Sequence, residues 1–326
     1  MNPQTEIPVQ NPSLAQRFAG PVALLCIFCT SAVCATVYFS ASGNPVAAAQ
    51  TAAAATPTTP DPFANISLQG ESAYVLDLTD GHVLFSSNAD VQLPLASMTK
   101  VATMLAVSQV LPPDSLIKIP YDTAPKGSAE RLAAGQTWRV QDVINFTLIA
   151  SSNDGADILA QAADADISAK YPQAPVGSAT LWRMNDIARS LGLANTYFLN
   201  DNGLDISTTQ AGAYGSARDV ATLFAYAATS APDVFAGTTQ DGVLLTSVDG
   251  EQTSAFNTDK ALGAIPGLVM GKTGYTDLAG GNLGIVFNVG PGHPVVAVVL
   301  HSTETGRFDD MKALVSAAVT AVSEGR

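Results

Sequence analysis

Cysteine is scarce in this chain of 326 residues, and its three copies are confined to one place. Cys26, Cys29 and Cys34 all lie within a single apolar segment near the N-terminus, so the rest of the sequence contains no thiol. A disulfide framework is therefore excluded outside that segment, as is a metal site with cysteine ligands.

Histidine and positive charge are also in short supply. Of the three histidines, His82 and His293 lie in turn-like settings and His301 ends an expected strand. These scattered imidazoles are too few for a zinc site or a Ser-His-Asp triad, so we expect no metal and no other cofactor. The 15 lysines and arginines are outnumbered by 28 acidic residues, and the net charge of −13 argues against binding to nucleic acid.

One long apolar run lies near the N-terminus. It extends from about Val22 to Phe39, and no charged residue follows it before Asp61. Its length lies between that of a signal-peptide core and that of a membrane-spanning helix; it favours an uncleaved signal anchor, while a cleaved signal peptide stays open. We therefore expect a cytoplasmic tail at residues 1–18, a transmembrane signal anchor or signal peptide at 19–41, and attachment to the membrane through this segment.

The composition changes after this run. Residues 42–62 are rich in alanine, threonine and proline and offer nothing to bury, which indicates a linker. The remaining residues 63–326 have the size of one large domain, and a hydrophobic content of 47% is sufficient for its core.

Strand patterns occur at both ends of this domain, and helical patterns lie between them. The expected strands cover Tyr74–Leu78, Val83–Phe85, Leu283–Val289 and Val295–His301. Helices are expected at 181–191, at 217–228 and, at the end of the chain, at 309–323. We therefore predict an α/β sandwich, in which an antiparallel sheet from both chain ends carries helices on both faces and a helical lobe is inserted between them.

Ser97 and Lys100 lie three residues apart at the start of an expected helix. Pro94 can occupy the first turn of this helix, and the apolar residues 101–107 continue it as a helix buried on all sides. Residues three apart share one helical face, so a neutral Lys100 amine can take the proton of the Ser97 hydroxyl. Burial and a second cation, Lys272, are both expected to lower the pKa of that amine.

The same spacing occurs at Ser115 and Lys118, so spacing alone does not identify a nucleophile. Prolines on both sides of that segment leave no room for a helix. An isolated match is more often a solvated lysine on a helix surface, and the assignment of Ser97 therefore depends on further motifs.

A second polar motif, Ser151-Ser152-Asn153, lies between helices expected at 140–150 and from Gly155 onwards. Such a connection ordinarily caps the second helix, and this alternative stays open. In the functional interpretation, Ser151 is hydrogen-bonded to Ser97 and Lys100, and Asn153 holds a substrate amide.

A third motif lies on the expected strand at 268–276. It contains Lys272 and Thr273, which we expect to face a binding site, and Gly274, which lacks a side chain where a peptide could add as a further strand. The alternative is a simple strand and turn, with the glycine serving local geometry.

These three motifs, in this order, resemble those of the penicillin-binding proteins and serine β-lactamases. Longer matches resemble the low-molecular-mass D-alanyl-D-alanine carboxypeptidases, serine peptidase family S11. These matches lie at residues 95–100, 149–156, 202–205, 271–276 and 279–283. The resemblance covers roughly residues 66 to 320, and it departs from the family at Asn282, where a cysteine is common.

The resemblance implies a role for each matched residue. It implies that Ser97 is the nucleophile, Lys100 the general base and Ser151 a proton relay, with an oxyanion hole formed by the backbone amides of Ser97 and Tyr275. The implied substrate-binding residues are Asn153, Lys272, Thr273, Gly274, Tyr275 and Arg307. For Arg307, a surface arginine at a helix start is the alternative.

The implied function is that of a serine D,D-carboxypeptidase, which removes the C-terminal D-alanine from peptidoglycan pentapeptide stems. A D,D-endopeptidase that cleaves peptidoglycan cross-links is the alternative. A β-lactamase fits less well, since no glutamate occurs between Glu130 and Glu251. The alternative of an inactive cell-wall binding protein is disfavoured, because the catalytic motif residues Ser97, Lys100, Ser151 and Lys272 are all present.

The resemblance also implies partners and a location. The partners are peptidoglycan stem peptides, together with β-lactam antibiotics as covalent inhibitors. The expected location is the bacterial cell envelope, with the domain outside the cytoplasm and anchored to the inner membrane, or secreted if the N-terminal segment is cleaved.

Overall fold

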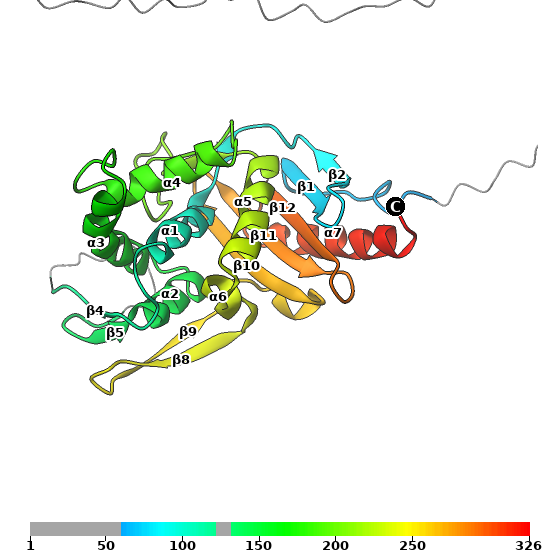
Figure 1. The fold of residues 1–326 in the computed structure, drawn as a ribbon. Coiled ribbons are helices and arrows are strands. Elements are labelled where there is room, and N and C mark those ends of the chain that lie inside the picture. The colour runs from blue at the N-terminus through cyan, green and yellow to red at the C-terminus, as the bar shows by residue number, and fades with distance from the viewer. Residues whose placement is uncertain (1–59, 122–131) are drawn as a thin grey trace, which may run out of the picture. The chain divides into compact units, whose positions relative to one another are not determined.

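A five-stranded antiparallel sheet forms the centre of the computed structural model, which describes residues 60–121 and 132–326 (Figure 1). The strand order is β10-β11-β12-β1-β2. These strands are β1 (Ser72–Asp77), β2 (Val83–Ser87), β10 (Leu268–Thr276), β11 (Gly280–Asn288) and β12 (Pro294–Ser302). Because β1 pairs with β12, from Ser72 opposite Leu300 to Asp77 opposite Val295, the two ends of the domain meet inside one sheet. The predicted α/β fold class, with a sheet from both chain ends, is confirmed.

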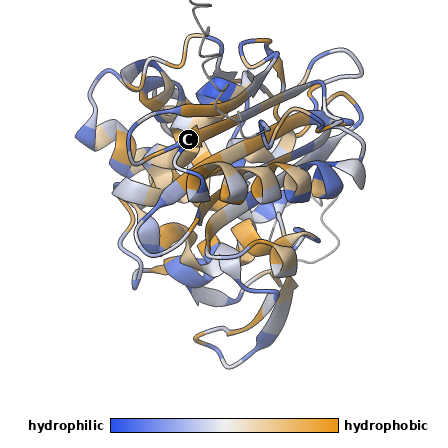
Figure 2. Ribbon diagram, turned by 90° about the vertical axis from the view of Figure 1, so that its right-hand side faces the viewer, coloured by the Kyte–Doolittle hydropathy of each residue, from blue (hydrophilic) through white to orange (hydrophobic). Residues whose placement is uncertain are grey.

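The sheet is covered on both faces, which is why its inner strands are hydrophobic on both sides. In β12, Val296 and Val298 belong to one hydrophobic core, whereas Val295 and Val299 belong to another. Helices α1 (Thr99–Ser108) and α5 (Ala217–Ser230) supply the first core. Helix α7 (Gly306–Ser323) supplies the second, on the opposite face (Figure 1). Figure 2 accordingly shows predominantly hydrophobic strands in the sheet.

A helical lobe is inserted between β2 and β10. Its helices are α1, α2 (Val140–Ile149), α3 (Asn153–Lys170) and α4 (Ala179–Ser190), followed by α5 and the short α6 (Pro232–Phe235). Three short 3₁₀ turns are η1 (Ala96–Met98), η2 (Ala236–Thr239) and η3 (Leu262–Ala264). The lobe agrees with the predicted insertion of helices between the terminal strands.

Short strands complete the lobe and its border with the sheet. They are β3 (Leu93–Pro94), β4 (Leu116–Lys118), β5 (Thr137–Arg139), β6 (Tyr197–Phe198), β7 (Ala213–Gly215), β8 (Gly242–Thr246) and β9 (Gln252–Phe256). β8 and β9 form a hairpin that projects at the bottom of Figure 1 and that the sequence analysis did not predict.

Several boundaries differ from expectation by a few residues, and two of them lie next to the functional residues. Pro94 does not begin a helix, because it pairs with Tyr214 in β3, and the pairing continues through a hydrogen bond from the Leu95 amide to Ala213 O at 3.0 Å. The last helix begins at Gly306 rather than at Asp309. At this earlier start, the Gly306 amide donates a hydrogen bond to Thr303 Oγ1 at 2.9 Å.

The expected tail, the expected anchor and nearly all of the expected linker lie outside the described residues. The boundaries at 18, 41 and 62 therefore stay predictions. Within residues 60–121 and 132–326, no helix combines the length and the hydrophobicity that crossing a bilayer requires.

Candidate active site

Ser97 lies in the middle of η1, directly before α1. Its neighbours Ala96 and Met98 are buried, whereas Ser97 is only half-buried. Ala96 adopts a left-handed backbone with φ of +49°, and its carbonyl accepts a hydrogen bond from Thr99 Oγ1 at 2.7 Å. This tight turn leaves Ser97 partly exposed at the start of a buried helix.

Lys100 is fully buried, and its amine nitrogen has three oxygen neighbours. Its Nζ lies 2.8 Å from Ser97 Oγ, 2.7 Å from Asn153 Oδ1 and 2.6 Å from the carbonyl oxygen of Asn202. The amide and carbonyl oxygens can only accept hydrogen bonds, so they use both N–H groups of a neutral amine. The remaining lone pair then points to the Ser97 hydroxyl, as a general base requires.

The pKa of Lys100 supports this protonation state. Burial lowers it to about 7, while the carboxylate of Asp157 acts in the opposite direction. Burial also lowers the pKa of Lys272, to well below its ordinary value, and the charges of Lys100 and Arg307 lower it further. The repulsion between the two lysines, expected because of their proximity, contributes to the lowered pKa of Lys272.

Ser151 adopts a left-handed backbone with φ of +57°, which is uncommon for a residue with a side chain. Its Oγ accepts a hydrogen bond from Lys272 Nζ at 2.8 Å. The expected hydrogen bond to Ser97 or Lys100 is therefore wrong for this structure, because the turn after α2 directs the side chain to β10.

The alternative function of this motif, capping of the second helix, is confirmed for Ser152. Ser152 is the N-cap of α3, and its Oγ accepts a hydrogen bond from the Gly155 amide at 3.1 Å. Asn153 begins α3 and uses Oδ1 to accept from Lys100. The motif thus has two functions: Ser152 caps α3, while Ser151 contacts Lys272 and Asn153 contacts Lys100.

Lys272 and Thr273 are buried at the centre of β10. Lys272 Nζ also donates to Thr273 O at 2.9 Å, and Thr273 Oγ1 lies 2.6 Å from Thr258 Oγ1. The expected strand at 268–276 has the same boundaries as β10. Lys272 therefore extends from an edge strand of the sheet to Ser151, on the lobe.

Gly274 brings β10 against the Ser97 turn. A Cβ at this position would lie 2.8 Å from Leu95 O and 3.2 Å from the Met98 amide nitrogen. The sequence pattern suggests space for an added peptide strand as the reason for this glycine, but the structure requires it for contact with the backbone around Ser97. The adjacent Tyr275 is 46% exposed at the edge of the sheet.

Asn282 holds the same turn from β11. Its Nδ2 donates to Pro94 O at 3.0 Å and to Leu95 O at 3.1 Å, and its Oδ1 accepts from the His301 amide at 2.8 Å. From the sequence, Asn282 is recognisable only as a residue that replaces a common cysteine. Its hydrogen bonds link two strands to the segment that leads into Ser97.

Arg307 is 7% exposed, so the surface alternative is wrong. Its guanidinium donates to Gly274 O at 2.6 Å and lies 5.9 Å from the Tyr275 ring centroid. Burial lowers its pKa, which the carboxylates of Glu304 and Asp259 oppose. The arginine therefore places a cation beside the Lys272-Thr273-Gly274 segment.

Two acidic residues near the two lysines were not predicted from the sequence. Asp157 Oδ1 accepts from Asn202 Nδ2 at 2.8 Å, and Asn202 O in turn accepts from Lys100. Asp259 is buried near Lys272 and Arg307, and its charge opposes the lowering of the pKa of each. Asn202 and Gly203 belong to a sequence match, at residues 202–205, to which no role was assigned. The structure explains the glycine, because Gly203 has φ of +84° and a Cβ there would lie 1.9 Å from Ala96 O.

The competing Ser115 and Lys118 pair is not brought to this site. Residues 116–118 form β4, and Ser115 Oγ donates to Pro112 O at 2.6 Å. In the described part of the chain, no three histidine, cysteine, aspartate or glutamate side chains are grouped to hold a metal ion.

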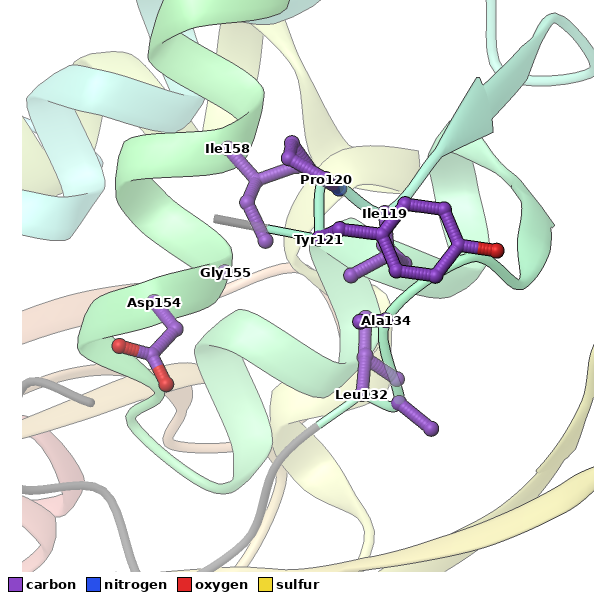
Figure 3. Close-up of a pocket in the computed structure, with 9 residues that line it drawn as sticks. Ile119, Pro120, Tyr121, Leu132, Ala134, Asp154, Gly155 and Ile158 are labelled. Atoms are coloured by element: carbon purple, nitrogen blue, oxygen red, sulfur yellow. The ribbon is translucent and has the colours of Figure 1, made fainter. Parts of the chain in front are cut away.

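A cavity of about 360 Å³ adjoins the start of α3 (Figure 3). Asp154, Gly155 and Ile158 line it from α3, and Ile119 to Tyr121 lie opposite. The serines and lysines of the three motifs do not line this cavity; they are Ser97, Lys100, Ser151, Ser152 and Lys272. The cavity is therefore separate from the site around Ser97.

Comparisons with known proteins agree with this geometry. The family model described as D-alanyl-D-alanine carboxypeptidase, peptidase S11, matches residues 54–304. D-alanyl-D-alanine carboxypeptidase DacF of Bacillus subtilis is 30% identical over 218 residues, which are 64% of this chain and 51% of that protein. A D-alanyl-D-alanine endopeptidase of Pseudomonas aeruginosa is 32% identical over 178 residues, 52% of this chain and 53% of that protein.

Among solved structures, the chain is similar to penicillin-binding protein D2 from Listeria monocytogenes in its ampicillin-bound form. The identity is 27% and the TM-score 0.65, over 78% of this chain and 98% of that one. The chain spans about half the length of the two curated relatives described above.

Proposed function

Since this chain belongs to the peptidase S11 family, the D-alanyl-D-alanine carboxypeptidases, we propose that it is a serine D,D-carboxypeptidase acting on peptidoglycan pentapeptide stems. The observation that carries this proposal is the 2.8 Å distance between Ser97 Oγ and the buried amine of Lys100. A hydroxyl is a weak nucleophile until a neighbouring base takes its proton. With a pKa of about 7, Lys100 is substantially neutral at physiological pH.

In the first step, Ser97 Oγ attacks the carbonyl carbon of the penultimate D-alanine while Lys100 takes the hydroxyl proton. The backbone amides of Ser97 and Tyr275 stabilise the oxyanion, an effect that is often the largest in acyl transfer. The C–N bond then breaks, and the departing amine of D-alanine receives the proton that Lys100 took from Ser97, with Ser151 as the proposed relay. Water hydrolyses the ester on Ser97, again with Lys100 as the base.

Substrate binding uses the groups around β10. Lys272, Thr273 and Arg307 hold the terminal carboxylate, since charge-assisted hydrogen bonds are about twice as strong as neutral ones. Asn153, whose Oδ1 accepts from Lys100, is the proposed contact for a substrate carbonyl. The backbone at Gly274 and Tyr275 aligns the peptide along the strand.

β-Lactam antibiotics are the proposed covalent inhibitors. The similar Listeria protein has been solved with ampicillin and with cefotaxime bound. A β-lactam carbonyl reacts with Ser97 by the same first step, and its ring opens in place of the departing amine.

Digestion of purified muropeptides tests the proposal. The purified full chain in detergent is expected to convert pentapeptide stems to tetrapeptide stems with release of one D-alanine, measured by mass spectrometry. Ser97→Ala is expected to lose both this activity and covalent labelling by a fluorescent penicillin. Ser115→Ala is the matched control and is expected to retain both. Labelling that persists in Ser97→Ala and disappears in Ser115→Ala would contradict the assignment.

For the location, we propose a bacterial cell-envelope protein that residues 19–41 anchor to the inner membrane. The support is the apolar run from Val22 to Phe39. Cell fractionation with mass spectrometry of the N-terminus tests this, with Met1 retained in the membrane fraction as the expected result. A soluble form that begins near Gln50 would show cleavage instead.

A further inference from the structure

Asp259 is a buried carboxylate that has no part in the mechanism above. It lies between β9 and η3 and is 6% exposed. Its Oδ1 accepts a hydrogen bond from the Ala261 amide at 2.8 Å, and its own amide donates to Asn257 Oδ1 at 2.9 Å. Its other oxygen, Oδ2, has no hydrogen-bond partner among the described residues. A buried carboxylate oxygen of this kind is rare and calls for an explanation.

This oxygen lies against the backbone of β10. A Cβ on Gly271, the residue directly before Lys272, would lie 3.6 Å from Asp259 Oδ2. The residue before Asp259 also contacts β10, because Thr258 Oγ1 lies 2.6 Å from Thr273 Oγ1. The segment that carries the carboxylate is therefore held against the part of β10 that contains Lys272.

Lys272 needs a positive charge for its proposed role. Its Nζ already donates to Ser151 Oγ at 2.8 Å and to Thr273 O at 2.9 Å. A neutral amine has only two N–H groups, whereas an ammonium has three. Only the ammonium form of Lys272 can therefore keep both contacts and donate a third hydrogen bond to a substrate carboxylate.

The surroundings of Lys272 oppose this charge. The residue is 2% exposed, and burial is the main reason why its pKa is lowered. The charges of Lys100 on α1 and Arg307 on α7 lower the pKa of Lys272 further. In the described part of the chain, Asp259 is the acidic residue whose charge acts in the opposite direction. A buried cation is costly unless an anion compensates its charge.

The cations around Asp259 favour its own charged form. Burial raises the pKa of Asp259, whereas the hydrogen bond from the Ala261 amide lowers it. The charges of Arg307, Lys272 and Lys260 lower it as well. The carboxylate and the two buried cations therefore stabilise one another's charges.

We propose that Asp259 is a positioning residue for substrate binding: its carboxylate keeps the amine of Lys272 charged, so that Lys272 can hold the terminal carboxylate of the substrate. The inference rests on the proposed D,D-peptidase function and adds a residue that acts through Lys272 without touching the substrate. It makes the upper pH limit of substrate binding depend on Asp259. Without the charge of Asp259, the pKa of Lys272 falls further, and the ammonium is lost at a lower pH.

Two peptides and one isosteric variant test the proposal in the full chain. The peptides are diacetyl-L-Lys-D-Ala-D-Ala and its C-terminal amide, which has no carboxylate for Lys272 to bind. Asp259→Asn removes the charge and keeps an oxygen for the Ala261 amide. In this variant, we expect the alkaline midpoint of kcat/KM for the acid to move to lower pH by about one pH unit. Above that midpoint, kcat/KM should be about tenfold lower, through a higher KM.

The amide is expected to be cleaved at the same rate by the wild type and by Asp259→Asn. Asp277→Asn makes the same charge change on the exposed turn between β10 and β11, and it should leave the alkaline midpoint unchanged. An unchanged midpoint in a folded Asp259→Asn protein would overturn the proposal. An equal loss for the acid and the amide would also overturn it, because that result indicates a purely structural role.

Failure of the proposed function is distinguishable from these outcomes. In that case the wild-type chain would cleave neither peptide, and penicillin would not label Ser97, which would contradict both proposals. Labelling of Ser97 and cleavage of the acid by the wild type, together with an unchanged Asp259→Asn profile, would contradict only the role of Asp259.

Discussion

The amine of Lys100 lies 2.8 Å from the hydroxyl oxygen of Ser97, while Asn153 Oδ1 and Asn202 O lie 2.7 and 2.6 Å from the same nitrogen. The two amide-type oxygens orient the amine, because they accept its hydrogens and leave its lone pair to the hydroxyl. This relationship connects η1, α1, α3 and the loop that contains Asn202 at one nitrogen. It also makes the protonation state of Lys100 the main variable of the proposed reaction.

The first prediction is a pH dependence of acylation. Burial lowers the pKa of Lys100 to about 7, so the active neutral amine predominates above this value and the inactive ammonium below it. The second-order rate constant for penicillin acylation should therefore rise with pH through a midpoint near 7 and fall about tenfold per pH unit well below it. A rate that is constant from about pH 5 to 9 would exclude Lys100 as the base.

The second prediction concerns the position of that midpoint. Asp157→Asn removes the carboxylate that opposes the lowering of the Lys100 pKa, and it keeps an oxygen to accept from Asn202 Nδ2. The acylation midpoint should shift to lower pH. Asp166→Asn makes the same change on the exposed face of α3 and should not shift it. A shift to higher pH in Asp157→Asn would contradict the electrostatic explanation.

The third prediction tests the contact between β10 and the Ser97 turn. Gly274→Ala places a Cβ 2.8 Å from Leu95 O, so β10 and the turn must move apart. Penicillin acylation should slow by up to about a hundred-fold, because a displacement of about 1 Å has that effect on reactions in oriented sites. Gly263→Ala is the control, since a Cβ there meets nothing within 4 Å. Equal acylation by both variants would show that the contact has no catalytic consequence.

The fourth prediction concerns Arg307. Arg307→Ala removes a buried cation from the proposed carboxylate site, and we expect a loss of about 1.5 to 3 kcal/mol of transition-state binding to pentapeptide. This corresponds to about ten- to a hundred-fold in kcat/KM. Penicillin acylation should decrease less, because ring strain makes the β-lactam reactive by itself.

The control for Arg307 is Arg189→Ala, at an arginine whose side chain is 61% exposed on α4. It should leave pentapeptide cleavage unchanged. Thermal unfolding of both variants separates a binding defect from a folding defect. An unchanged kcat/KM in a folded Arg307→Ala protein would exclude the arginine from substrate binding.

The sequence alone predicted the parts of this protein that depend on local pattern. Alternating hydrophobic residues and turn glycines predicted the terminal hairpins, and the apolar stretch after Lys100 predicted a buried helix that the structure has at Thr99–Ser108. The three-residue spacing of Ser97 and Lys100 predicted their contact, because one turn of a helix brings such residues together. The strand from Leu268 to Thr276 was predicted at its observed boundaries.

Only the tertiary structure decided which distant groups meet. Ser151 and Lys272 are 121 residues apart, and their hydrogen bond depends on how the lobe packs against the edge of the sheet. The same packing buries Arg307 against Gly274 and places Asn202 O on Lys100, 102 residues away in sequence. Local periodicity reaches only a few residues along the chain. The chemistry of this site depends on contacts between distant segments. These contacts are determined by the burial of two hydrophobic cores on opposite faces of one sheet.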